Sequence, residues 1–242
     1  MRGSVTRVGT MPLRLAIIGD GKMGRAIASL ADEHGFTVVA ILGEGEVLPQ
    51  GLTKSLLHGA DVAVEFTAPL HAAANVRGCV AAGCPVVCGT TGWDEARATV
   101  EKEVRAKKGA LLWAPNFSIG VYLFARIVEH AVGVVAKSHA GFDAHLVETH
   151  HRQKLDAPSG TARALAERAA KAAGKPLPIT SVRVGSVPGT HEVIFDGAFE
   201  QIRLEHIARD RRVFATGALT AARWLVGRHG VFTLDHMLGG ST

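Results

Sequence analysis

The chain has 242 residues, of which 47% are hydrophobic and 20% charged, a composition typical of a globular protein. The net charge is +5, but the basic residues are scattered and aromatic residues make up only 5%. This pattern predicts no nucleic-acid partner and favours a site for phosphates and carboxylates. No uninterrupted apolar run reaches the roughly 18 residues of a membrane span, so no membrane partner is expected.

Residues 1–10 are polar and contain no apolar signal-peptide core, so we expect a disordered leader and a folded part that begins near Met11. The three cysteines, Cys79, Cys84 and Cys88, have neither the even number of a disulfide framework nor CxxC spacing. They are expected to be small buried side chains in a cytoplasmic protein.

Strands and helices alternate through the first half of the sequence. Short apolar runs predict strands at 13–18, 37–42, 61–66, 85–88 and 110–114. Helical spacing between them predicts helices at 22–34, 71–82 and 94–107. This alternation predicts a doubly wound, Rossmann-like parallel sheet with helices on both faces, and Pro69 is expected to end the third strand.

The pattern changes after Asn116. Helices are predicted at 119–135 and 159–173, and strands at 142–149, 181–187, 191–195 and 200–208. The last three strands have no intervening helix, which favours antiparallel pairing. A final helix at 219–226 is expected to return to the first domain. We therefore expect a dinucleotide-binding domain of residues 11–117 with 214–242, and a smaller α+β domain of residues 118–213 with an open mixed sheet.

A GxGxxG sequence follows the first predicted strand and opens a helix, which is the context of a dinucleotide-binding loop. Its residues, all predicted to contact the cofactor, are Gly19, Asp20, Gly21, Lys22, Met23 and Gly24. The first glycine permits a tight turn, the second a close approach of a pyrophosphate, and the third close packing of helix on strand. A glycine-rich turn that only reverses the chain is the alternative.

The residue that reads the adenine ribose is expected after the second strand. Glu44 is the candidate for this residue. The alternative is that Gly43 occupies the ribose-reading position, which would weaken selectivity for NAD. Lys22 and Arg25 would suit a 2′-phosphate, or are simply solvated helix residues. The choice between NADH and NADPH therefore stays open.

Two later loops are predicted to lie at the same end of the sheet, because each follows a parallel strand. Their candidate cofactor-binding residues are Gly89, Thr90 and Thr91 in one loop, and Ala114, Pro115, Asn116 and Phe117 in the other. Ordinary turn chemistry is the alternative for Gly92 and Pro115.

The segment from Glu148 to Thr161 places titratable side chains between a predicted strand and the start of a helix. His150, His151 and Lys154, followed by a helix N-terminus at Gly160 and Thr161, suit a small dianion. A histidine that titrates near neutral pH is suited to general acid catalysis. Together with a hydride donor, these residues predict reduction of a C=N or conjugated C=C bond.

Two other interpretations of this segment remain. Adjacent histidines are often packing residues, and the Ser159 region is also compatible with a plain helix cap. A metal site is the other interpretation, because four histidines lie close in sequence: His139, His145, His150 and His151. HExxH is absent, and no carboxylate has suitable helical spacing to these residues, so no metal is expected.

The motif Glu-x-His-His-Arg-x-Lys-x-Asp-Ala-Pro-Ser-Gly-Thr over 148–161 resembles that of the dihydrodipicolinate reductases. The GxGKMG loop, Phe66-Thr67, Gly89–Gly92, Ala114–Ser118 and Gly189 with His191 extend the resemblance over nearly the whole chain after Met11. It implies that His150 is the general acid and base, that Lys154 donates a proton and binds substrate, and that His151, Gly160 and Thr161 contact substrate.

The resemblance further implies an NAD(P)H-dependent reduction of 4-hydroxy-tetrahydrodipicolinate in lysine biosynthesis by a cytoplasmic homotetramer that assembles through the open sheet. The chain departs from the family pattern in the short segment 43–59 and at Ala68, where some members carry arginine. The alternatives are another two-domain NAD(P)-dependent dehydrogenase of small amino or carboxylic acids, and a regulator that binds NAD(H) and DNA. The regulator would need a basic recognition element, which the sequence lacks.

Overall fold

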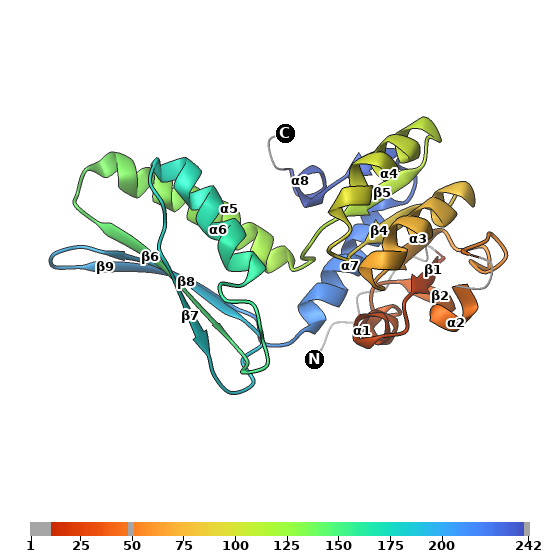
Figure 1. Cartoon of the computed structure of the whole chain (residues 1–242), viewed down its shortest axis with the longest axis horizontal. Helices are drawn as coiled ribbons and strands as arrows, with labels where there is room; N and C mark the ends of the chain where they lie inside the picture. The colour runs from red at the N-terminus through yellow and green to blue at the C-terminus, as the bar shows by residue number, and fades with distance from the viewer. Residues whose placement is uncertain (1–10, 48–50, 240–242) are drawn as a thin grey trace, which may run out of the picture. The chain divides into compact units, whose positions relative to one another are not determined.

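The computed structural model describes residues 11–47 and 51–239, so the expectation of a disordered leader at 1–10 lies outside the described residues. The chain divides into two compact units, each with its own sheet (Figure 1). The first unit contains the residues up to Phe117 and those from Ala215 onward, and the second is Ser118–Phe214.

The sheet of the first unit is entirely parallel, as the alternation of strands and helices predicts. Its strand order is β10-β5-β4-β3-β1-β2. The strands are β1 (Leu13–Ile18), β2 (Phe36–Leu42), β3 (Val62–Glu65), β4 (Val86–Cys88), β5 (Ala110–Trp113) and β10 (Gly230–Phe232). The sequence did not predict β10, because three half-buried residues form too short an apolar run to stand out.

The helices of this unit cover both faces of the sheet. They are α1 (Lys22–Leu30), α2 (Glu44–Val47), α3 (Pro69–Ala81), α4 (Asp94–Ala106), α7 (Arg212–Leu225) and α8 (Leu234–Met237). One alternating set of strand residues, including Ala16 and Val86, packs with residues of α3 and α4. The other set, including Ile17 and Val87, is also fully buried, as a sheet covered on both faces requires.

Two helices begin earlier than expected. Pro69 does not end the third strand but opens α3, because a proline at the first helical position needs no N–H partner. The helix α7 begins at Arg212 rather than near 219. Its buried residues are mostly small, including Ala215 and Gly217, so the hydrophobic pattern marked only its end.

The second unit is an open, four-stranded mixed sheet in the order β7-β6-β8-β9. The strands are β6 (Asp143–His150), β7 (Ile179–Arg183), β8 (Thr190–Asp196) and β9 (Gln201–Ile207). The expectation of antiparallel pairing among the last three strands is correct for β8 with β9 but wrong for β7. The helix α6 (Gly160–Ala173) connects β6 to β7, and this βαβ crossover makes β7 pair parallel with β6.

One face of this sheet is covered by α6 and by α5 (Ile119–Ser138), as Figure 1 shows. The core between them contains Phe124 and Val128 of α5, Leu165 of α6, and Leu146 and Val193 of the strands. The side chains of these strands alternate between this core and the open face.

Among the described residues, α5 is the one helix long and apolar enough to cross a membrane by length and composition. Core helices of soluble proteins share this length and composition. Phe124 and Val128 face the sheet, whereas Leu123, Ile127 and Val134 are exposed.

Candidate active site and cofactor cavity

A cavity of about 440 Å³ lies at the carboxyl ends of β1, β2 and β3 in the first unit. Such ends are where ligands bind in open α/β sheets. The lining residues are Ile18, Gly19, Asp20, Gly21, Leu42, Gly43, Glu44, Val47, Gly51, Leu52, Phe66, Thr67, Ala68, His71, Ala74 and Asn75. The cavity thus combines a glycine-rich turn with apolar walls and a few polar groups, as a cofactor site requires.

The glycine-rich loop has the backbone that a pyrophosphate needs. Gly19 has a φ of +107°, which favours glycine, and α1 starts directly after Gly21 without a side-chain hydrogen bond to its N-cap. A Cβ atom on Gly21 would have no described atom within 4 Å, so the helix start is open. A Cβ atom on Gly24 would instead overlap the carbonyl oxygen of Gly19. The loop therefore fits a dinucleotide, with its helix N–H groups available for phosphate.

Carboxylates gather where the adenine ribose is expected, after β2. The backbone N–H of Gly43 donates to Glu46 Oε2 at 2.7 Å, and a Cβ atom on Gly43 would lie 3.2 Å from Asp20 Cγ. Glu44 Oε1 lies 3.5 Å from His71 Nε2. Asp20 and Glu44 both line the cavity, and Glu46 is a further carboxylate that the sequence pattern did not single out.

The rest of the predicted loop lies beside the cavity rather than in its wall. Lys22, Met23 and Gly24 begin α1 and are not among the lining residues. The lining residues that sequence reasoning did not assign come mostly from the segment after β3 and from α3, including Phe66, Thr67 and His71. Their position after a parallel strand was the available signal.

The two later loops support the wall of the cavity through Phe66 and Thr67. Thr90 Oγ1 accepts a hydrogen bond from the Thr67 N–H at 2.8 Å, and the rings of Phe117 and Phe66 lie 5.8 Å apart. A Cβ atom on Gly89 would overlap the ring of Phe66. The other predicted residues of these loops are not among the cavity-lining residues either: Thr91, Ala114, Pro115 and Asn116.

A buried carboxylate organises the same wall. Glu65, at the end of β3, is fully buried. It accepts hydrogen bonds from Thr67 Oγ1, from Asn75 Nδ2 at 3.3 Å and from Cys88 Sγ at 3.1 Å. Since Thr67 and Asn75 both line the cavity, Glu65 fixes two polar groups of its wall.

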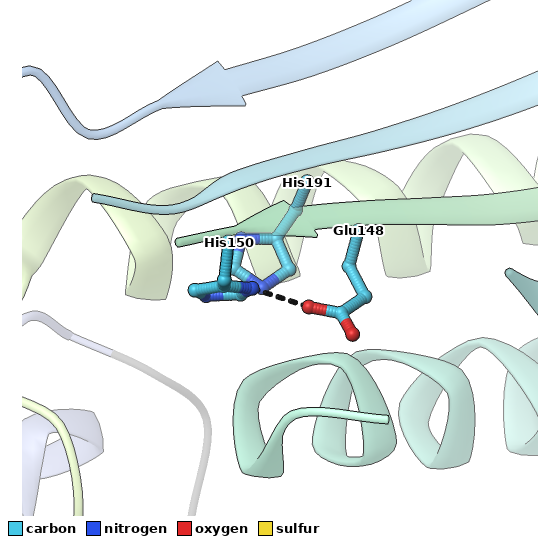
Figure 2. Close-up of side chains that lie close together, drawn as sticks. All are labelled: Glu148, His150 and His191. Atoms are coloured by element: carbon cyan, nitrogen blue, oxygen red, sulfur yellow. Dashed lines mark hydrogen bonds and ion pairs between the residues drawn. The ribbon is translucent and has the colours of Figure 1, made fainter. Parts of the chain in front are cut away.

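The second unit holds the titratable residues at the end of β6. Glu148 and His150 are two residues apart on this strand, so their side chains lie on the same face. Glu148 is completely buried and His150 is 8% exposed. The two form a short hydrogen bond between His150 Nδ1 and Glu148 Oε2 (Figure 2).

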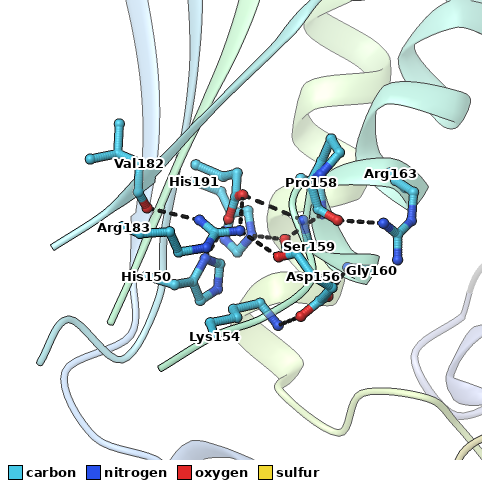
Figure 3. A network of polar contacts seen from close by, with 12 residues as sticks. His150, Lys154, Asp156, Pro158, Ser159, Gly160, Arg163, Val182, Arg183 and His191 are labelled. Carbon is cyan, nitrogen blue, oxygen red and sulfur yellow. Dashed lines mark hydrogen bonds and ion pairs between the residues drawn. The ribbon is translucent and has the colours of Figure 1, made fainter. Parts of the chain in front are cut away.

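Arg183 of β7 holds the other oxygen of this carboxylate. Its Nη2 donates to Glu148 Oε1 at 2.7 Å and to the Asp156 carbonyl at 2.6 Å (Figure 3). The parallel register, which places His150 opposite Arg183, produces this contact. Burial raises the pKa of Glu148, but the hydrogen bonds from Arg183 and Ser181 and the nearby positive charge outweigh burial and lower it to about 2.

His191 of β8 completes the cluster. Its ring lies edge-on to that of His150 at a centroid distance of 5.3 Å, and its Nε2 is 3.4 Å from Ser159 Oγ. Burial, then the charge of His150, lowers the pKa of His191 to about 4, so its ring is neutral at pH 7. Burial also lowers the pKa of His150, although Glu148 opposes that shift.

The remaining predicted substrate residues lie on the loop that leads into α6. Lys154 Nζ is 2.7 Å from Asp156 Oδ1, so this cation has a partner in the chain. The Gly160 N–H donates to Asp156 Oδ2 at 3.3 Å, and Thr161 follows in the first turn of α6. The Nδ1 atom of His151 is buried without a hydrogen-bond partner among the described residues.

The donor set Glu148, His150 and His191 also meets a distance criterion for metal ligands, since one ligand atom from each lies within 4.8 Å of the others. It is not the group of histidines that the sequence suggested. The Arg183 guanidinium already occupies this carboxylate, and its positive charge opposes a metal ion there. The arrangement instead suits proton transfer by a histidine that a carboxylate orients.

Two family descriptions match nearly the whole chain. The N-terminal region of dihydrodipicolinate reductase matches residues 13–117, and its C-terminal region matches residues 120–238. The chain belongs to the dihydrodipicolinate reductase family.

Relatives in this family cover the chain almost completely. A 4-hydroxy-tetrahydrodipicolinate reductase of Thiobacillus denitrificans is 35% identical over 270 residues, which cover 95% of this chain and 99% of that protein. One from Xanthomonas campestris pv. campestris is 39% identical over 230 residues, which cover 90% and 94%. These matches confirm the family resemblance that the sequence motifs indicate.

A solved dihydrodipicolinate reductase has the same architecture. The dipicolinate-bound enzyme from Paenisporosarcina sp. TG-14 matches with a TM-score of 0.76 and 26% identity over 92% of this chain and 98% of that chain. An amine dehydrogenase from Mycobacterium smegmatis, at 12% identity and a TM-score of 0.59 over 92% of this chain and 95% of its own, shares the fold alone. The Rossmann-like prediction is therefore confirmed, with a second, mixed sheet.

Proposed function

We propose that this chain reduces 4-hydroxy-tetrahydrodipicolinate to tetrahydrodipicolinate with NADH or NADPH, in the diaminopimelate route to lysine. One observation carries the proposal. The second unit of this family member has a buried, carboxylate-bound His150 beside Lys154 and the start of α6, and the first unit has a cavity lined by the glycine-rich loop. Residues 11–117 with 214–242 would bind the cofactor, and residues 118–213 the substrate.

The glycine-rich loop would hold the cofactor. Gly19 and Gly21 admit the pyrophosphate to the N-terminus of α1, and Glu44 lies where a ribose hydroxyl would be bound. The loops at 89–91 and 114–117 would hold Phe66 and Thr67 in place, and these two residues form part of the cavity wall. When bound, a reduced nicotinamide supplies hydride.

The second unit would bind the dianionic substrate and transfer a proton. Lys154 and the N–H groups at Gly160 and Thr161 suit carboxylates. Both Lys154 and the Gly160 N–H now contact the Asp156 carboxylate, which a substrate carboxylate would replace. The unpartnered Nδ1 of His151 is a further hydrogen-bonding atom for substrate. His150 would act as the general acid.

The open face of the second sheet supports assembly into a homotetramer. It lies opposite the face that α5 and α6 cover, and it exposes Val182 and Ile207, which are 37% and 55% exposed. These exposed apolar side chains and the unpaired edges of β7 and β9 favour burial against another copy. We place the enzyme in the cytoplasm, where its three free thiols would stay reduced.

The test is a coupled assay in which freshly generated substrate is supplied with NADH or NADPH in parallel. Turnover with either cofactor is expected for the wild-type protein. His150→Ala and Lys154→Ala should each lose most turnover while NADH still binds, as measured by the fluorescence of the cofactor. Near-normal rates in both variants, or no turnover by the wild type, would overturn the proposal.

A further inference from the structure

Glu148 is a buried ionic group that the proposed roles leave unused. It has no exposed surface, yet its two oxygens have separate partners in the chain. One oxygen is bound to His150 Nδ1, and the other to Arg183 Nη2 at 2.7 Å and to the Ser159 N–H at 3.4 Å (Figure 3). A buried carboxylate with this many fixed partners has one geometry, and so does the imidazole that it contacts.

The hydrogen bond to Glu148 decides which nitrogen of His150 meets a substrate. A carboxylate accepts from Nδ1–H, so the neutral ring carries its proton on Nδ1 and Nε2 is the atom left for proton exchange. Gly189 leaves space beside that nitrogen, since a Cβ atom on Gly189 would lie 3.0 Å from His150 Nε2. On another side, the edge-on ring of His191 limits rotation of the His150 ring (Figure 2).

Charged groups from every neighbouring element act on His150. Glu148 on its own strand favours the imidazolium, whereas Arg183 of β7 and Lys154 of the following loop disfavour it. His191 of β8 is neutral, and burial also lowers the pKa of His206 of β9, which faces His191. Among the described residues whose charge acts on the pKa of His150, Glu148 is therefore the negative one.

We infer that Glu148 is a positioning residue that fixes His150 with Nε2 free to deliver the proton, and that Arg183 holds Glu148 in place. In this step the Nε2–H bond of the imidazolium breaks as a bond to the proton forms on the reduced substrate. The ring becomes neutral and keeps its Nδ1–H on Glu148. The inference rests on the proposed function and adds two residues to it.

Glu148→Gln keeps the shape of the side chain and removes its charge. We expect kcat to fall by about 10- to 100-fold, the range for loss of a partner that orients a histidine, with NADH affinity unchanged. The high-pH limb of kcat/KM should shift to lower pH, because the imidazolium loses its counter-charge. The matched control is Glu192→Gln, which removes a carboxylate paired with Arg203 at 3.0 Å on the neighbouring strand and should leave the profile unchanged. A wild-type rate and pH profile in Glu148→Gln would overturn the inference.

A second measurement does not depend on activity or on the folding of a variant. Nitrogen-15 NMR of the wild-type protein, with His150 assigned through its loss in His150→Ala, should show the neutral ring protonated on Nδ1. A ring protonated on Nε2 would refute the positioning role even if the enzyme is active. If the wild type is inactive but His150 is protonated on Nδ1, the proposed substrate is refuted, whereas the inferred pairing of Glu148 with His150 is supported.

The carboxylates beside Gly43 carry a separate inference about the cofactor. Asp20, Glu44 and Glu46 surround the end of β2, and Asp20 and Glu44 line the cavity. Lys22 and Arg25, the cations considered for a 2′-phosphate, are exposed and are not lining residues. A 2′-phosphate would bring additional negative charge to this acidic corner, whereas ribose hydroxyls can donate to carboxylates. We propose that the chain selects NADH over NADPH through this corner.

Cofactor titrations without substrate test the selection. The dissociation constant of NADPH should exceed that of NADH by about tenfold or more, equal to roughly 1.4 kcal/mol. Glu44→Gln should narrow this ratio, and Glu95→Gln, an exposed carboxylate on α4, should not. Equal affinities for the two cofactors, or an unchanged ratio in Glu44→Gln, would refute the selection whatever the substrate is.

Discussion

Replacing His191 with glutamine should make the stability of the protein less sensitive to acid. His191 is 4% exposed on β8, and burial together with the charge of His150 lowers its pKa to about 4. The ordinary pKa of histidine is 6.5. Between these two values the unfolded chain binds a proton that the folded chain does not, so the free energy of unfolding must fall as the pH falls.

The size of this effect follows from the two pKa values. Each pKa unit corresponds to about 1.4 kcal/mol, so His191 should remove about 2 kcal/mol of stability between pH 7.5 and pH 5. Above pH 6.5 the contribution vanishes, because neither state binds the proton. The lowered pKa of Glu148, about 2, acts in the same direction, but only below the ordinary glutamate value of 4.5. The chosen pH range therefore separates the two groups.

Urea unfolding at pH 7.5 and pH 5.0 would measure the difference. Far-UV circular dichroism is the suitable signal, because all three tryptophans lie in the other unit of the chain. The loss of stability between the two pH values should be about 2 kcal/mol smaller in His191→Gln than in the wild type. His130→Gln on the exposed face of α5 is the control and should behave as the wild type. An identical pH dependence in the wild type and His191→Gln would show that His191 is not held neutral.

The cofactor loop, the thiols and α7 give four further predictions. Gly24→Ala should lower the stability of the first unit by about 1–3 kcal/mol, because its Cβ atom would overlap the Gly19 carbonyl. Gly21→Ala should keep the melting temperature but weaken NADH binding in a fluorescence titration, and a normal affinity would argue against phosphate at this turn. Burial raises the pKa of all three thiols, so a thiol reagent at pH 8 should label them only after urea unfolding; rapid labelling of folded protein would contradict this. Gly217→Ala should destabilise the same unit by a similar amount in thermal melts, because its Cβ atom would overlap the Phe117 carbonyl, whereas an unchanged melting temperature would mean that the contact can relax.

Local sequence determined the first unit and much of the second. Short apolar runs predicted five strands, and the alternation with helices predicted the parallel sheet. The spacing of Gly19, Gly21 and Gly24 predicted a tight turn, an open helix start and a close backbone contact, and each glycine has the surroundings that this prediction requires. The pairing of Glu148 with His150 is also local, since residues i and i+2 of one strand share a face. The sequence therefore contains enough information to pair Glu148 with His150. Chemical roles in this segment were nevertheless predicted only for the two histidines and Lys154, and none for Glu148.

The tertiary structure alone decided what surrounds His150. Arg183 reaches Glu148 because α6 returns the chain so that β7 lies parallel to β6, and the local pattern of β7 predicted the opposite pairing. His191 arrives from β8 on the other side of the same strand. Strand order depends on long-range packing rather than on local periodicity, so the sequence determined which residues are reactive and the sheet determined which of them meet.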